Sequence, residues 1–225
     1  MHPYLHAQSQ GDKAAYVMSG SGEVVTYAQL EARSNQGAHL FRSLGLQQGD
    51  VIAILMENMP EYFELAWGAQ RAGLYYVCIS TKLTGGEIAY ILEDSGAKAL
   101  FLSPGLQKHG LEALAEPSAK AAGVKGFSVG GAIAGLPAYE AERAKYPDAR
   151  IADETAGADM LYSSGTTGRP KGVRVALSGL EIDAPNPLMM LTQALYGLAY
   201  TKTQTAFKHD ARQVLASLLE GGVPT

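Results

Sequence analysis

Short apolar runs alternate with amphipathic helical segments along the first 130 residues, and this rhythm constrains the fold more than any other feature. The clearest run is Val51–Leu55, five consecutive apolar residues typical of a strand that is covered on both faces. Further strands are predicted at residues 24–25, 75–79, 97–103 and 124–129, with helices between them. The alternation predicts an α/β fold, in which helices flank a largely parallel sheet.

The ends of the predicted helices carry recognisable start and stop residues. Two Thr-x-x-Gln/Glu patterns are capping boxes, in which the side chains at a helix start satisfy each other's backbone amides. Glycines follow several of the helices and favour their termination. The start residues are Thr26 with Gln29, Asn58 with Pro60 and Glu61, and Thr84 with Glu87. The terminating glycines are Gly45, Gly73 and Gly96.

The pattern weakens from residue 130 to residue 157, where we expect a surface connection with one short helix at 139–145. Strands are predicted again on both sides of a polar loop, at 158–162 and 172–177. The last stretch predicts two helices, at 187–200 and 207–220. We therefore divide the chain into residues 1–177, an α/β subdomain that ends in this loop, and residues 178–225, a partial helical continuation.

Composition excludes several classes of protein. Hydrophobic residues make up 47% and charged residues 18% of the 225, as in globular rather than disordered chains. The net charge of -4 gives no basic field for nucleic acid. No apolar stretch approaches the ~20 residues that span a bilayer, and the N-terminus lacks signal-peptide features, so we expect a cytoplasmic protein. The single cysteine, Cys78, lies in an apolar strand and is expected to be a small buried residue.

The polar loop has the composition of a phosphate-binding site. It reads Tyr-Ser-Ser-Gly-Thr-Thr-Gly-Arg-Pro-Lys-Gly over residues 162–172. Glycines allow close backbone approach to an anion, hydroxyl groups add donors, and a lysine adds positive charge. The predicted nucleotide-binding residues are Ser163, Ser164, Gly165, Thr166, Thr167, Gly168 and Lys171.

Two other interpretations of this loop were weighed. An ordinary Gly/Ser/Thr hairpin loop would explain a four-residue piece of it, but not the whole run. A P-loop of the G-x-x-x-x-G-K-[ST] type fails, because Pro170 stands where the second glycine is needed and Gly172 where Ser or Thr is needed.

This run resembles the signature of the adenylate-forming superfamily, approximately [YF]-[ST]-[SG]-G-[ST]-T-G-x-P-K-G, at every position. Upstream segments agree, and the resemblance covers roughly residues 20–198. Residues 25–30 (Val-Thr-Tyr-Ala-Gln-Leu) and 49–54 (Gly-Asp-Val-Ile-Ala-Ile) look like early segments of that family, as does the stretch 58–77. Within the family the chain looks most like a fatty-acyl or aryl acyl-CoA synthetase.

The resemblance implies an activity and its cofactors. Such enzymes activate a carboxylic acid with ATP and Mg2+, release pyrophosphate and transfer the acyl group to coenzyme A. In relatives the loop hydroxyls and lysine contact the β- and γ-phosphates. The resemblance assigns these roles to Ser164, Thr166, Thr167 and Lys171, with backbone access at Gly165 and Gly168.

Other motifs of the family are absent from the printed sequence. We find no Y-G-x-T-E, T-G-D or P-[LM]-[FY]-H segment after the loop, and no counterpart of the catalytic lysine. We therefore expect a truncated, N-terminal portion of an acyl-CoA synthetase that is inactive alone. Three hypotheses stay open: a ligase completed by a partner chain that supplies the C-terminal half, a non-catalytic nucleotide-binding or regulatory fragment, and a decayed gene product.

Overall fold

Strand β3 (Val51–Leu55) is buried on both faces, and its alternating side chains divide the core in two. In the computed structural model, which describes residues 3–163 and 170–184, Ile52 and Ile54 belong to one hydrophobic cluster. Val51, Ala53 and Leu55 belong to a second cluster. A strand has a side-chain period of two, so a run without polar residues requires cover on both faces, as predicted.

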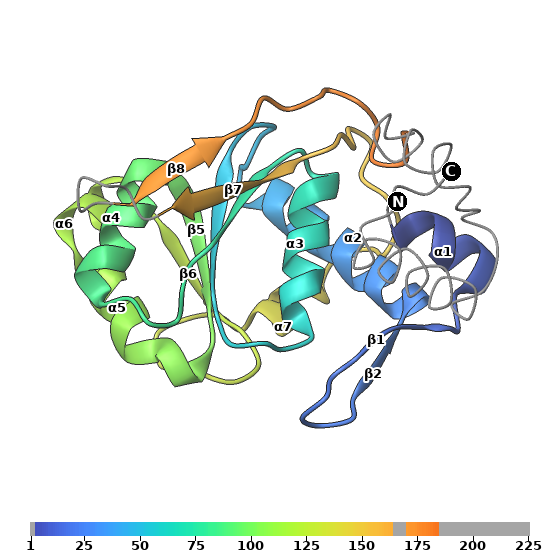
Figure 1. Cartoon of the computed structure of the whole chain (residues 1–225), viewed down its shortest axis with the longest axis horizontal. Helices are drawn as coiled ribbons and strands as arrows, with labels where there is room; N and C mark the ends of the chain where they lie inside the picture. The colour runs from blue at the N-terminus through green and yellow to red at the C-terminus, as the bar shows by residue number, and fades with distance from the viewer. Residues whose placement is uncertain (1–2, 164–169, 185–225) are drawn as a thin grey trace, which may run out of the picture. The chain divides into compact units, whose positions relative to one another are not determined.

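The main sheet has six strands in the order β6-β5-β3-β4-β7-β8 (Figure 1). All neighbouring pairs are parallel except the last, β7 with β8, which is antiparallel. The predicted α/β fold with a largely parallel sheet is confirmed. The remaining strands are β4 (Tyr75–Cys78), β5 (Ala97–Leu102), β6 (Lys125–Ser128), β7 (Ala158–Ser163) and β8 (Lys171–Arg174).

Helices cover both faces of this sheet (Figure 1). The first cluster is closed by α2 (Tyr27–Ser43), α3 (Glu61–Arg71) and α7 (Tyr139–Arg143). The second cluster is closed mainly by α4 (Gly85–Ser95) and α5 (Gln107–Ala115). Two short elements lie beside them, η1 (Pro104–Leu106) and α6 (Pro117–Ala121).

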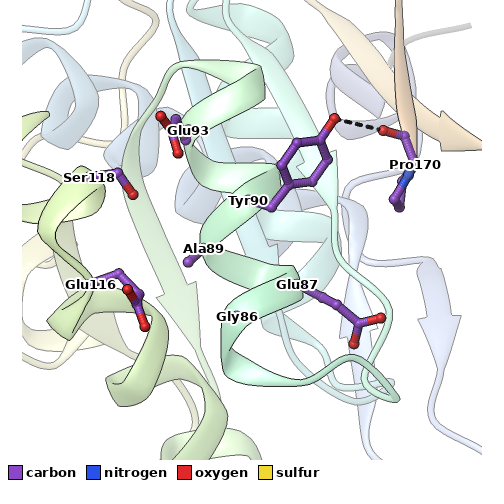
Figure 2. Close-up of a pocket in the computed structure, with 8 residues that line it drawn as sticks. All are labelled: Gly86, Glu87, Ala89, Tyr90, Glu93, Glu116, Ser118 and Pro170. Carbon is purple, nitrogen blue, oxygen red and sulfur yellow. Dashed lines mark hydrogen bonds between the residues drawn. The ribbon is translucent and has the colours of Figure 1, made fainter. Parts of the chain in front are cut away.

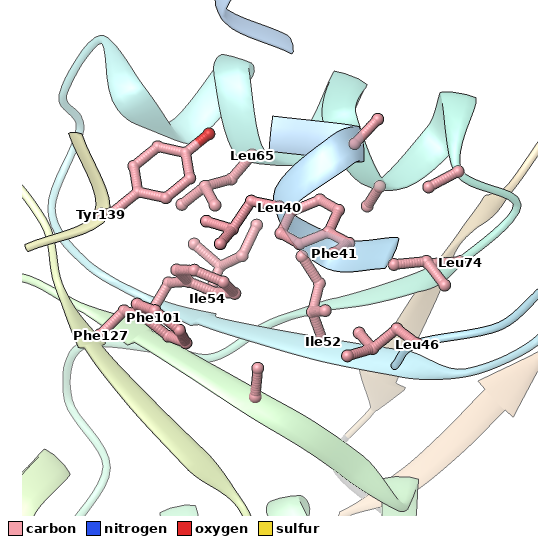
Figure 3. Packing of buried hydrophobic residues seen from close by; sticks show 14 of the residues in the cluster. Leu40, Phe41, Leu46, Ile52, Ile54, Leu65, Leu74, Phe101, Phe127 and Tyr139 are labelled. Atoms are coloured by element: carbon pink, nitrogen blue, oxygen red, sulfur yellow. The ribbon is translucent and has the colours of Figure 1, made fainter. Parts of the chain in front are cut away.

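Aromatic side chains fill the centre of the first cluster (Figure 3). Phe101 on β5 stacks on Phe127 of β6 at 5.0 Å between ring centroids. Phe41 from α2 and Tyr139 from α7 meet Phe101 edge-on, at 5.7 and 5.5 Å. These offset and edge-on arrangements are the favoured ones for aromatic pairs, and they join α2 and α7 to the sheet.

Both predicted capping boxes are formed. The Thr26 and Thr84 side chains accept from the amides of Gln29 and Glu87, whose side chains accept in return. Gly96 ends α4 with φ of 69°, a left-handed conformation that favours glycine. The expected start at Pro60 is confirmed, but Asn58 provides no side-chain cap.

Two N-terminal elements were not predicted. Helix α1 (Pro3–Gln10) precedes β1 (Ala14–Val17), which pairs with β2 (Val24–Thr26) in a separate antiparallel sheet. The run Ala14-Ala15-Tyr16-Val17 was the available signal, but four residues give a weak periodicity.

The stretch 130–157 is more than the surface connection that we expected. It forms the predicted short helix as α7, and it also places Tyr139 and Ile151 in the first cluster. A segment poor in periodic pattern can still pack single side chains, because burial of one residue leaves no repeat in the sequence.

The prediction for Cys78 was wrong. Cys78 is an exposed residue at the carboxyl end of β4. The pairing of β4 with β7 covers only Tyr75 and Tyr76, so the end of β4 has no strand on that side.

Residues His2–Asp183 form one compact unit. Within residues 3–163 and 170–184, every helix is too short or too polar to serve as a membrane span. The predicted helices 187–200 and 207–220 lie outside the described residues, and the division at residue 177 stays a prediction.

Candidate functional site

Two of the predicted phosphate-binding residues lie within the described part of the chain. Ser163 is the last residue of β7 and Lys171 is the first of β8, and the two are direct partners in the antiparallel pair. Both are exposed. The other five predicted residues, Ser164, Gly165, Thr166, Thr167 and Gly168, lie outside the described residues. The two described ends of the run are therefore brought together by strand pairing.

The side chains of the β7–β8 hairpin alternate between two environments. Met160 is buried in the second cluster and Tyr162 packs against that cluster, whereas Leu161 and Ser163 are exposed. Gly172 stands opposite Tyr162 in the register. A Cβ at Gly172 would lie 2.5 Å from Cε of Met160 and 3.0 Å from the Tyr162 ring. The last glycine of the signature thus leaves room for the tyrosine with which the signature begins.

The start of β7 is fixed by a close approach to the turn between α3 and β4. The amide of Gly157 donates to the Gln70 carbonyl at 2.7 Å, and the amide of Ala158 donates to the Leu74 carbonyl at 3.1 Å. A Cβ at Gly157 would lie 2.2 Å from the Leu74 carbonyl oxygen, which no side chain tolerates. Glycine is therefore required where the chain enters β7.

Helix α4 contacts both ends of the hairpin. The Tyr162 hydroxyl donates to Oδ2 of Asp94 at 2.7 Å. The Tyr90 hydroxyl donates to the carbonyl of Pro170 at 3.1 Å (Figure 2). Burial and the neighbouring Asp94 carboxylate raise the pKa of Tyr162, so its hydroxyl stays protonated and can donate. Sequence reasoning missed Tyr90 and Asp94, because nothing in the sequence distinguishes them from other residues on the helix surface.

Tyr75 of β4 contacts the end of β8 and the residue that follows it. The Tyr75 hydroxyl donates to the Val175 carbonyl at 2.6 Å. The Arg174 guanidinium lies 4.3 Å from the centre of the Tyr75 ring and donates to the Gly49 carbonyl. Arg174 is therefore already engaged in holding the strand.

Lys171 differs from Arg174 in this respect. Among the salt bridges between described residues, none includes Lys171. An exposed lysine that has no carboxylate partner among residues 3–163 and 170–184 can bind an anionic ligand without first losing an ion pair to one of them.

A surface pocket of about 440 Å³ lies beside Pro170, between α4 and α6 (Figure 2). Three carboxylates line it, those of Glu87, Glu93 and Glu116. Hydrogen bonds from Thr84 lower the pKa of Glu87, which keeps it ionised. A polyphosphate would be repelled by this lining, so the pocket is not its binding site.

The described residues also bear on metal binding. Within them, no group of three or more His, Cys, Asp or Glu side chains is placed to hold a metal ion. The structure therefore assigns no Mg2+ ligand in this part of the chain.

Comparison with known proteins places this geometry in a family. The family model described as "AMP-binding enzyme" matches residues 5–216. The chain is 32% identical to fatty acid–[acyl-carrier-protein] ligase ScoC of Streptomyces coeruleorubidus, over 76% of this chain and 31% of the relative. It is 31% identical to 4-coumarate–CoA ligase 1 of Petroselinum crispum, over 83% of this chain and 36% of the relative.

A solved structure agrees in fold. The N-terminal domain of FACL13 from Mycobacterium tuberculosis superposes with a TM-score of 0.63 at 28% identity, over 76% of this chain and 42% of that one. The chain spans about a third of the length of the curated relatives it matches. The family model matches most of the chain, including the hairpin and the run at its end, and the chain belongs to the AMP-binding enzyme family.

Proposed function

We propose that this chain is the phosphate-binding part of an AMP-forming acid–CoA ligase. The observation that carries the proposal is the pairing of Ser163 with Lys171, which joins the two ends of the signature run. The family membership supports the same conclusion.

The proposed contacts follow from the chemistry of the run. The hydroxyls of Ser163, Ser164, Thr166 and Thr167 donate to the oxygens of the ATP phosphates, and Lys171 adds a positive charge. Gly165 and Gly168 allow backbone amides to approach the same anion. A hydrogen bond to a charged group contributes roughly 1.5–3 kcal/mol, so several together suffice to hold a triphosphate.

The reaction that we propose has two steps. A carboxylate oxygen of a fatty or aryl acid attacks the α-phosphorus of ATP, and the bond to the leaving pyrophosphate breaks. The thiol of coenzyme A then attacks the acyl carbon and releases AMP. Mg2+ would neutralise phosphate charge in the first step. The residues described here are assigned only to holding the phosphates that leave.

The full reaction requires more than this chain provides in its matched region, since that region corresponds to about a third of its relatives. We therefore propose that catalysis needs a partner chain that supplies the remaining part of the site. A non-catalytic, nucleotide-binding role is the second candidate. A cytoplasmic location is proposed for either role.

The test combines binding with catalysis. Calorimetry of the full chain with Mg-ATP is expected to show binding, and carboxylate-dependent ATP–pyrophosphate exchange is expected to be absent for the chain alone. Exchange should appear when a fragment covering the unmatched part of a relative is added, and the same mixture with Lys171→Ala is the control. If the chain binds no ATP at millimolar concentration, both candidate functions are overturned. If it binds ATP but no mixture shows ATP–pyrophosphate exchange, only the non-catalytic, nucleotide-binding role stands.

A further inference from the structure

The β7–β8 hairpin leaves the parallel sheet before it reaches the signature run. Pairing of β7 with β4 ends at the Tyr76–Asp159 pair, whereas pairing of β7 with β8 continues to Ser163 and Lys171. The last four residues of β7 therefore have a strand neighbour on one side only. Strand pairing alone leaves a two-stranded ribbon of this kind marginally stable, so its direction must be set by other contacts.

Those contacts come from one face of α4. Tyr90 and Asp94 are four residues apart, which places them one above the other on the helix surface. Asp94 accepts from Tyr162 of β7 at 2.7 Å, and Tyr90 donates to the carbonyl of Pro170, next to β8, at 3.1 Å (Figure 2). One helix thus holds both arms of the hairpin, at Tyr162 and Pro170 near the two ends of the run.

Helix α4 is a rigid support for this purpose. The Thr84–Glu87 capping box caps its first turn, and Gly96 caps its last turn. Ile88, Ile91 and Leu92 are buried in the second cluster. A helix that is capped at both ends and packed along its length transmits its position to the residues bonded to it.

We propose that Tyr90 and Asp94, together the α4 clamp, are positioning residues that fix the spacing and direction of the two ends of the phosphate-binding run. This inference rests on the function proposed above. The clamp touches no phosphate itself. It reduces the number of arrangements that the ends of the run adopt before ATP binds, and pre-organisation of this kind raises affinity.

The test uses four substitutions, at the clamp residues and at their partner Tyr162, and one matched control in the full chain. Tyr162→Phe and Asp94→Ala remove the hydrogen bond between these two residues, Tyr90→Phe removes the one to Pro170, and Asp94→Asn keeps an oxygen that accepts from Tyr162. The control is Tyr16→Phe, because the Tyr16 hydroxyl also donates to a proline carbonyl, that of Pro60, at 2.9 Å. Asp94 is exposed, so its replacement leaves the core packed.

Two measurements separate the clamp from the proposed nucleotide site. Hydrogen–deuterium exchange of peptides covering 158–163 and 171–175 reports on the hairpin without ATP. Calorimetry with Mg-ATP measures the affinity of the phosphate-binding run for the nucleotide. We expect faster exchange and about three- to tenfold weaker ATP binding in the three disrupting variants, with Asp94→Asn and Tyr16→Phe close to the unmodified chain.

Unchanged hairpin exchange in the disrupting variants would overturn the clamp. Faster exchange with unaltered ATP affinity would overturn its positioning role, and so would an equal loss of affinity in Tyr16→Phe. If the unmodified chain binds no ATP, the proposed function fails, and the exchange measurement alone then decides the clamp.

Discussion

The buried guanidinium of Arg71 donates to Oε1 of Glu154 at 3.1 Å, and the two side chains are only 0% and 5% exposed. Arg71 ends α3, whereas Glu154 lies in the stretch that leads into β7. The same guanidinium binds Glu31 of α2 at 2.6 Å. One arginine therefore joins two helices of the first cluster to the segment that delivers the candidate site.

Replacing Arg71 is expected to destabilise the fold strongly. Arg71→Met keeps an apolar side chain of similar length but leaves Glu31 without its cation and Glu154 with Arg150 alone. Removing one partner of a buried ion pair typically lowers the free energy of unfolding by about 3–5 kcal/mol. Urea denaturation followed by far-UV circular dichroism measures the change.

Lys98→Met is the matched control for that substitution. Lys98 binds Asp50 at 2.8 Å, but its side chain is 52% exposed. Exposed pairs contribute roughly 0–1 kcal/mol. Equal destabilisation by the two substitutions would contradict the structural role given to Arg71.

Adding one methyl group at Gly157 is expected to displace β7. The Cβ of Gly157→Ala would meet backbone atoms of Leu74 and Ala69 at 2.2–2.9 Å, and backbone cannot rotate away as a side chain can. Overpacking of this kind destabilises by about 1–3 kcal/mol. Thermal denaturation measures this loss, and calorimetry should show weaker ATP binding because β7 carries Ser163.

Gly86→Ala separates this effect from a general effect of glycine replacement. Gly86 lies in α4, and a Cβ there would meet no atom within 4 Å. Alanine in a helix is favoured over glycine by about 1 kcal/mol, so this variant should be as stable as the original or more stable. A Gly157→Ala variant that behaves like Gly86→Ala would refute the close approach.

The elements that the sequence predicted well are those with local signals. The run Val51–Leu55 has no polar residue on either side of the strand, and this pattern alone indicates two covered faces. The capping residues Thr26 and Thr84 act on amides three residues away, so their spacing is visible in the sequence. For the same reason the signature run indicated its family without any structure.

The features that the sequence did not reveal depend on contacts between distant residues. Arg71 meets carboxylates 40 and 83 positions away, and Tyr162 meets Asp94 across 68 positions. None of these contacts between residues far apart in the sequence follows from a local pattern. Cys78 was misjudged for a related reason, since its exposure depends on where β7 stops pairing with β4.

Stability is expected to fall as the pH rises above the ordinary carboxyl range, in part because of Glu64. Its side chain has no exposed surface and lies 2.9 Å from Arg33 and 3.3 Å from Arg143. Burial raises the pKa of Glu64 above its ordinary value of 4.5, despite the two arginines. The folded chain therefore binds this proton more tightly than the unfolded chain, and the stabilising effect is lost as the pH rises through the folded pKa.

Glu64→Gln tests this pH dependence, because a glutamine cannot titrate. The free energy of unfolding should decline less steeply with pH in the variant than in the original chain, from pH 4.5 towards neutrality. Burial also raises the pKa values of Glu61 and Glu154, so part of the decline should remain. Parallel profiles for the two proteins, measured by urea denaturation at each pH, would refute the role of Glu64.

Replacing Lys171 is expected to weaken nucleotide binding while leaving the fold intact. The side chain is exposed and begins β8 opposite Ser163, so Lys171→Ala removes a charge without opening the core. Loss of one charged hydrogen bond, roughly 1.5–3 kcal/mol, corresponds to about 10- to 150-fold weaker ATP binding by calorimetry. Lys145→Ala removes the same charge from a lysine that follows α7 in the chain and binds Glu142 at 2.7 Å. An equal loss in both variants would point to the overall charge of the chain, whereas a loss confined to Lys171→Ala assigns the phosphate contact to that residue.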